Sequence, residues 1–223
     1  MTSSFHDQLV GDTVAERDLF MDIPLIRQAV AEGVAGPVYV DFLVAAYHHV
    51  KQTCPLLGLA LSRCGEGDGA YRAGLLEYLE EEKGHEEWIL NDIAALGGDR
   101  EAVRAGLAPF PVRMMVAYAT YAIEHLSPYA LLGMVHVLEG MSVALARAAA
   151  TSITSRLGLP AGADGGVAGF SYLTSHGHLD EDHVALFAGL LDQIDSPDRR
   201  RLVIQAAKDF YRLYGNIFRE LTQ

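Results

Sequence analysis

Apolar residues recur along this chain of 223 residues with the spacing of α-helices. Runs with a period of 3.6 residues occur throughout, and no segment alternates apolar and polar residues for long enough to predict a strand. The pattern predicts an all-α fold, a bundle of seven or eight helices. The expected helices cover residues 23–32, 37–63, 70–96, 100–105, 112–126, 129–157, 171–194 and 196–221.

Glycine and proline residues separate these helices. The stretch CGEGDG (64–69) stops the second helix, Pro128 marks a break or kink, and residues 158–169 form the clearest loop. No repeat, low-complexity segment or long linker divides the chain, so residues 1–223 are expected to form a single domain. The first 20 residues could be a loosely packed N-terminal arm.

Composition and charge exclude several partners. Half of the residues are hydrophobic, as in a compact globular protein, and the net charge is −12. That charge disfavours nucleic acid and anionic membrane surfaces as partners. Residues 34–61 are apolar but carry charged and histidine side chains, which indicates a buried core helix and not a membrane span. Two cysteines and no signal sequence predict a cytoplasmic protein.

The segment 170–190 holds the first candidate site. His176, Asp180 and His183 stand at i, i+4 and i+7, so a helix places them on one face. That face continues into apolar residues, and burying these groups unpaired would be costly. A divalent metal such as iron, manganese or zinc would remove the cost. The alternative is a histidine-rich helix start whose acids are solvated and favoured by the helix dipole.

The helix expected over 70–96 carries a second pair. Glu82 and His85 fall in the middle of an apolar stripe, whereas the other acids between 77 and 87 point away from it. Their Glu-x-x-His spacing is the one used in carboxylate-bridged dimetal sites of helical bundles. A local Glu–His hydrogen bond at the bundle edge is the alternative explanation.

Glu139 is the acidic residue whose position is least consistent with exposure to solvent. Its neighbours one and two turns away are all apolar, so its carboxylate must be paired, protonated or bound to a metal. His136, one turn earlier, is interpreted as a satisfied core histidine or a group that supports a ligand.

The second expected helix contributes two further histidines. Its phase directs His49 towards the core, and His48 shares a face with charged and polar residues. Both are weaker candidate ligands, because a hydrogen-bonded structural role explains either of them equally well. Together the stronger candidates supply three carboxylates and three imidazoles, which suit two metal ions better than a single zinc.

These motifs resemble the haem-oxygenase-like dimetal oxidases and oxygenases, whose fold is shared with TenA-like proteins. The resemblance extends from about residue 38 to the end and includes the sequence YHHVKQTCPLL. It implies a seven-helix haem-oxygenase-like domain with two irons, of which the second can be labile; manganese could replace iron. By this resemblance the ligands are Glu82, His85, Glu139, His176, Asp180 and His183. The chain departs from many members by having no acid between Asp41 and Glu66.

The resemblance implies an O2-activating enzyme that oxidises a small organic metabolite by decarboxylation, N-oxygenation, desaturation or C–C cleavage. The electron donor is not identified, and a homodimer is one assembly the sequence allows. Candidate walls of the substrate pocket are Tyr78, Tyr118, Tyr121, Met134 and Phe187.

Two other function classes stay open. A TenA-like hydrolase or a cofactor-free oxidase would need Cys54 or Cys64 as its nucleophile. A non-enzymatic carrier of haem or another small ligand would leave Glu139 and Asp180 unexplained.

Overall fold

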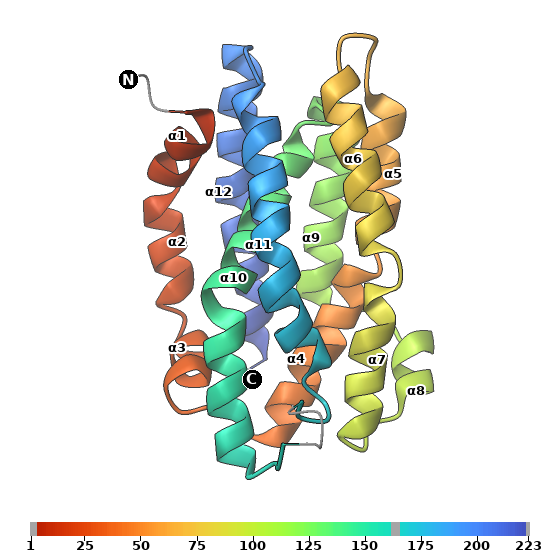
Figure 1. The fold of residues 1–223 in the computed structure, drawn as a ribbon, viewed down its shortest axis with the longest axis vertical. Helices are drawn as coiled ribbons and strands as arrows, with labels where there is room; N and C mark the ends of the chain where they lie inside the picture. Colours follow the sequence, from red (N-terminus) through yellow and green to blue (C-terminus); the bar gives the residue numbers. More distant parts are fainter. Residues whose placement is uncertain (1–3, 162–165, 222–223) are drawn as a thin grey trace.

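A computed structural model describes residues 4–161 and 166–221, except for the side chains of residues 176–182. The described chain is an all-α bundle without strands, which confirms the predicted fold class (Figure 1). Its helices, in chain order, are α1 (Phe5–Asp12), α2 (Val14–Met21), α3 (Pro24–Ala31), α4 (Gly36–Val50), α5 (Thr53–Arg63), α6 (Gly69–Glu82), α7 (His85–Ala95), α8 (Arg100–Ala105), α9 (Phe110–Tyr121), the π-helix η1 (Ala122–Leu126), α10 (Ala130–Leu157), α11 (Ser171–Asp192) and α12 (Pro197–Glu220).

The helix expected over 37–63 is divided into α4 and α5. The division at Lys51 and Gln52 follows from Pro55, whose ring would clash with the carbonyl of Lys51 in a continuous helix. Pro55 therefore lies in the first turn of α5, where its missing N–H has no helical acceptor to lose.

The helix expected over 70–96 is also divided, and this corrects the prediction of one continuous stripe. Lys83 is extended and Gly84 has φ +88°, a conformation that favours glycine. Glu82 consequently ends α6 and His85 begins α7. The two side chains belong to different helices and do not share one helical face.

The long helix α10 packs against α11, α12 and α3. Gly133 allows α10 to approach α12 closely, because a Cβ there would lie 2.6 Å from the backbone nitrogen of Ala207. α10 is also long and apolar enough to cross a membrane, and α3 with the α4–α5 segment would count as a second, bent span. However, 56% of the most apolar window of α10 is buried inside the bundle, as in a core helix.

Residues 5–21 form two helices that pack on the bundle, not the loosely packed arm that the sequence allowed. Phe5, Leu9 and Phe20 are at most 2% exposed. Phe20 stacks on Tyr214 of α12 with ring centroids 5.3 Å apart. The apolar side of these short helices thus completes the core beside α12.

Candidate metal centre

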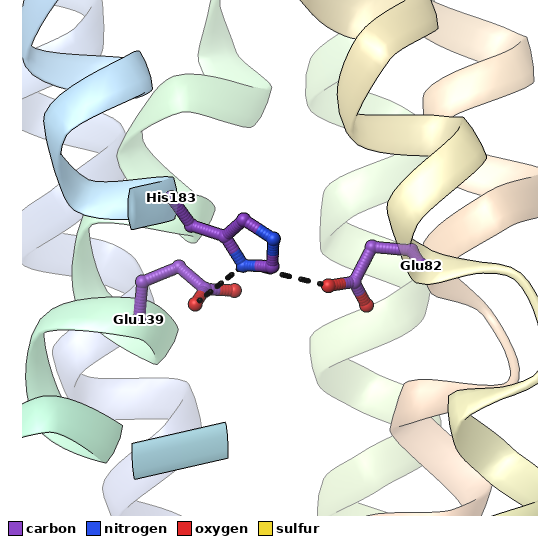
Figure 2. Close-up of side chains that lie close together, drawn as sticks. All are labelled: Glu82, Glu139 and His183. Carbon is purple, nitrogen blue, oxygen red and sulfur yellow. Dashed lines mark ion pairs between the residues drawn. The ribbon is translucent and has the colours of Figure 1, made fainter. Parts of the chain in front are cut away.

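Three buried side chains from three helices converge in the middle of the bundle. Glu82 comes from the end of α6, Glu139 from α10 and His183 from α11, and they are 4%, 8% and 2% exposed. One potential ligand atom from each lies within 4.8 Å of the others, and Figure 2 shows the three side chains pointing towards one another. The chain thus brings together residues separated by about a hundred positions into a group that can hold a metal ion.

His183 lies between the two carboxylates. Its Nδ1 is 3.7 Å from Glu82 Oε1 and 3.5 Å from Glu139 Oε2 (Figure 2). Its Nε2 lies 3.1 Å from Glu81 Oε2. A carboxylate on the far nitrogen fixes the orientation of an imidazole ligand and raises its basicity.

His85 lies beside the second oxygen of the Glu82 carboxylate, the one that does not face His183. Its Nδ1 is 3.4 Å from Glu82 Oε2, and its ring stacks on Trp88 with centroids 4.2 Å apart. The two oxygens of Glu82 therefore face two different imidazoles, His183 and His85. The turn at Gly84 produces this arrangement, because it lets His85 begin a new helix beside the end of α6.

Tyr78 connects α6 to Glu139. Its hydroxyl donates a hydrogen bond to Glu139 Oε1 at 2.5 Å, and its ring meets His183 and Phe187 edge-on. Glu139 Oε2, the oxygen nearest His183 Nδ1, is not the one bonded to Tyr78. Tyr78 thus holds the carboxylate in one orientation towards the centre of the group.

The donor set fits a metal ion. Among the described residues, Glu82 Oε1 is buried and accepts no hydrogen bond, which is costly for a carboxylate oxygen. Carboxylate and imidazole ligands together suit iron and manganese. His176 and Asp180 precede His183 on α11, but their side chains lie outside the described residues, so their ligation stays a prediction.

Asp92 anchors the beginning of the helix that carries His183. Its carboxylate, 2% exposed, accepts hydrogen bonds from the backbone N–H groups of Ser171 and Tyr172 and from the Ser171 hydroxyl. Burial raises the pKa of Asp92, although these hydrogen bonds oppose the rise. Asp92 thereby joins α7, which begins at His85, to α11.

The histidines of α4 are both buried, and only His49 lines the cavity at the candidate centre. The predicted inward direction of His49 agrees with this position; its Nδ1 lies 3.2 Å from the carbonyl oxygen of Ala45. His48 is 2% exposed and therefore does not lie on a solvated face. Burial and, as a smaller contribution, the positive charge of Lys51 lower the pKa of His48.

His136 belongs to the core and lies away from the centre. Its Nε2 is 3.5 Å from Thr13 Oγ1, and its ring is edge-on to those of His6 and Tyr211. Burial, with smaller contributions from His6 and Arg17, lowers the pKa of His136 to about 4.

Sequence reasoning missed Glu81 and misjudged part of the pocket wall. Glu81 was placed on the solvated face, yet the end of α6 lets its side chain reach His183. Tyr78 and Met134 line the cavity as expected. The other three candidates do not line it: Tyr121 is 52% exposed, Tyr118 donates to Asp209, and Phe187 meets the Tyr78 ring edge-on.

A family model described as an iron-containing redox enzyme matches residues 40–215. None of the curated proteins matches the chain.

Solved structures match nearly the whole chain. A domain of unknown function with a heme oxygenase-like fold from Shewanella denitrificans is 18% identical with a TM-score of 0.86, over 100% of this chain and 93% of that chain. A TenA homologue from Pseudomonas syringae is 14% identical with a TM-score of 0.79, over 97% and 91%. Heme oxygenase-1 from Synechocystis, in complex with heme, is 10% identical with a TM-score of 0.71, over 98% and 92%. At these identities the matches establish the fold, which is haem-oxygenase-like and TenA-like.

Proposed function

The chain belongs to the family of iron-containing redox enzymes, and we propose that it holds two iron ions and uses O2 to oxidise a small organic molecule. The observation that carries this proposal is the position of Glu82. This buried carboxylate directs Oε1 to within 3.7 Å of His183 Nδ1 and Oε2 to within 3.4 Å of His85 Nδ1. A carboxylate with a different imidazole at each oxygen is suited to bridging two metal ions.

Glu139 and His183 would hold one ion and His85 would hold the other, with Glu82 within reach of both. His176 and Asp180 are the expected further ligands from α11. Manganese could replace iron at such a set, because carboxylate and imidazole donors bind both ions. A labile second ion is consistent with the absence of an acid between Asp41 and Glu66 on the helices that face the site.

When bound, the two irons would supply electrons and open coordination positions for O2. The protein's own groups hold the ligands for that chemistry. Tyr78 orients Glu139, and Glu81 orients His183. The mostly apolar cavity next to Glu82 and Glu139 would limit the access of water to the reaction.

The partners of this reaction are O2, a small-molecule substrate and an electron donor whose identity the chain does not reveal. A cytoplasmic location fits two free cysteines, Cys54 and Cys64. A homodimer stays a prediction.

The structure gives less support to a cysteine-dependent activity of the TenA type. Burial raises the pKa of both Cys54 and Cys64, whereas a nucleophilic thiolate needs a lowered one. Within the described chain, neither thiol lines the cavity at the candidate centre.

Replacing Glu139 with Gln tests the proposal, because the change keeps the shape of the side chain and removes its charge. The purified protein would be loaded with ferrous iron without O2, and its iron content and O2 uptake would then be measured. We expect Glu139→Gln to lose at least one iron and the O2 uptake, while the exposed control Glu77→Gln keeps both. Unchanged iron content and O2 uptake in Glu139→Gln would show that Glu139 is a structural acid.

A further inference from the structure

Most of the large apolar side chains that the described chain exposes lie along the helix α9 and at its two ends. Five of the nine exposed ones fall within residues 107–126: Leu107, Phe110, Met114, Tyr121 and Leu126. Leu107 and Phe110 are 79% and 55% exposed. The π-helix η1 continues α9 directly, because Tyr121 and Ala122 both have helical backbone angles. α9 and η1 therefore form one extended apolar surface.

The exposed residues of α9 form a stripe on its outer face. Phe110, Met114 and Tyr121 stand at i, i+4 and i+11, which places them on one side of a helix. The opposite side is buried, with Met115 and Ala119 at most 1% exposed, and α9 packs against α12. A helix on the surface of a soluble protein normally has charged and polar residues on its outer face. The outer stripe of α9 has the opposite character.

The stripe is also poor in charge. Arg113 is the only charged residue between residues 105 and 123, although charged residues make up 21% of the chain. Depletion of charged residues together with aromatic, methionine and arginine side chains is typical of the cores of protein–protein interfaces. The net charge of −12, and the exposed Glu124 at the end of the stripe, disfavour an anionic lipid surface as the partner.

The size of the stripe matches one side of a dimer interface. From their exposed fractions, the five apolar side chains offer roughly 500 Å². Each side of a standard interface buries about 800 Å², of which about 65%, or roughly 520 Å², is apolar in homodimers. The exposed residues between the apolar ones, among them Arg113, Ala117 and Glu124, would supply the polar remainder.

The charges of the stripe are complementary to a second copy of the same stripe. Arg113 near the beginning of α9 and Glu124 on η1 are both exposed and lie about three turns apart. When two copies of α9 lie antiparallel about a two-fold axis near residue 118, each Arg113 faces the partner's Glu124. Met114 then lies within about one turn of the partner's Tyr121. Ala117 is close to the axis, where its small side chain allows the helices to approach.

We propose that two copies of this chain associate through the outer faces of α9 and η1, with these helices antiparallel across a two-fold axis. The apolar stripes pack on each other, and one pair of Arg113 with the partner's Glu124 closes each end of the contact. No candidate metal ligand lies on α9 or η1, so the proposal is independent of iron.

Sedimentation equilibrium of the full-length protein at micromolar concentrations, with and without iron, measures this association. We expect a dimer with twice the chain mass of 24.2 kDa. Ala117→Glu brings two like charges together near the axis and should weaken dimerisation by at least about 100-fold. Ala148→Glu is the matched control, because Ala148 is an exposed alanine of α10 beside α3; it should dimerise as the unmodified protein does.

Equal dimerisation of the two alanine variants would overturn the proposal, as would a monomer at every concentration. A monomer would leave the stripe to a different protein or to lipid, and flotation with phosphatidylcholine vesicles would distinguish these two.

Charge reversal tests the antiparallel pairing, and it also decides the proposal if Ala117→Glu does not fold. Arg113→Glu and Glu124→Arg each bring like charges together at both ends of the contact, so each should weaken the dimer by at least about tenfold. The double variant restores opposite charges and should dimerise within about threefold of the unmodified protein. A double variant as weak as the single ones would contradict the antiparallel pairing.

Discussion

Tyr78 and Glu81 each orient one candidate ligand, although neither of them was predicted to bind the metal itself. The Tyr78 hydroxyl donates to Glu139 Oε1 at 2.5 Å, and Glu81 Oε2 lies 3.1 Å from His183 Nε2. Removing a group of this kind typically weakens metal binding by about 10- to 100-fold. α6 therefore contributes two orienting side chains to the centre in addition to the candidate ligand Glu82.

Tyr78→Phe should weaken iron binding by about tenfold and leave the fold intact. The phenyl ring keeps its edge-on contacts with His183 and Phe187, while Glu139 Oε1 loses its donor. Equilibrium titration with ferrous iron measures the effect, with Tyr121→Phe at an exposed position as the control. An unchanged affinity in Tyr78→Phe would mean that the hydrogen bond does not orient a metal ligand.

His136 should make the stability of the metal-free protein depend on pH. Its pKa is about 4 in the fold, because burial and then His6 and Arg17 disfavour its charge, against about 6.5 in an unfolded chain. The folded state then binds fewer protons, so stability is complete above pH 6.5 and falls as the pH drops from about 6.5 to about 4. At pH 5 the loss from this residue should be about 2 kcal/mol relative to pH 8.

Urea unfolding of the unmodified protein and of His136→Gln at pH 8 and pH 5 measures this contribution. The difference in unfolding free energy between the two pH values should be smaller in the variant by about 2 kcal/mol. The same difference in both proteins would show that His136 is not buried in its neutral form.

The residues of the centre could be predicted in part from helix phase. Glu139 and His183 were recognisable because each lies on an apolar face of a continuous helix. Glu81 was not recognisable, because a half-exposed acid at the end of a helix has the pattern of a solvated residue. Its contact depends on where α11 passes α6, which local periodicity does not encode.

The turn between α6 and α7 is the element that brings Glu82 and His85 together. Gly84 adopts φ +88°, and a Cβ at this position would meet no atom within 4 Å. A side chain at this position would therefore meet no steric clash and would cost only the backbone strain of a positive φ, about 1–2 kcal/mol. The sequence did not predict this turn, because the Glu-x-x-His spacing also fits a continuous helix.

Gly84→Ala should destabilise the protein by about 1–2 kcal/mol and also weaken iron binding, because relief of the strain moves His85 away from Glu82. Gly97→Ala is a matched control. Gly97 also has a positive φ, +84°, and no atom within 4 Å of a Cβ, but it follows the end of α7 that is far from His85. Gly97→Ala should lose similar stability but bind iron normally. Thermal unfolding and iron titration of both variants test the idea, and equal iron affinities would contradict it.

The divisions between helices differ in how visible they are in the sequence. Pro128 predicted a break, and the chain is extended at Ser127 directly before it. Pro55 carried a similar signal for the division of α4 from α5, yet the apolar run through it favoured one helix. Proline position was therefore the better guide where the two signals conflicted.

For the molecule as a whole, the all-α class followed from periodicity, and the arrangement of the bundle did not. The packing of α10 depends on contacts with helices far away in the chain, such as the close approach of Gly133 to Ala207. The packing of α1 and α2 was also unexpected, because Phe5, Leu9 and Phe20 are too sparse to predict a buried face. Tertiary contacts, and not local propensity, stabilise these short helices.

The decisive measurement for a dinuclear centre is the number of irons bound per chain. Metal-free protein would be titrated anaerobically with ferrous iron, and bound metal would be measured after removal of the excess. We expect two irons per chain, one bound more weakly than the other, and the loss of both in Glu82→Gln. A single iron per chain in the unmodified protein, binding of zinc alone, or two irons retained in Glu82→Gln would contradict this expectation.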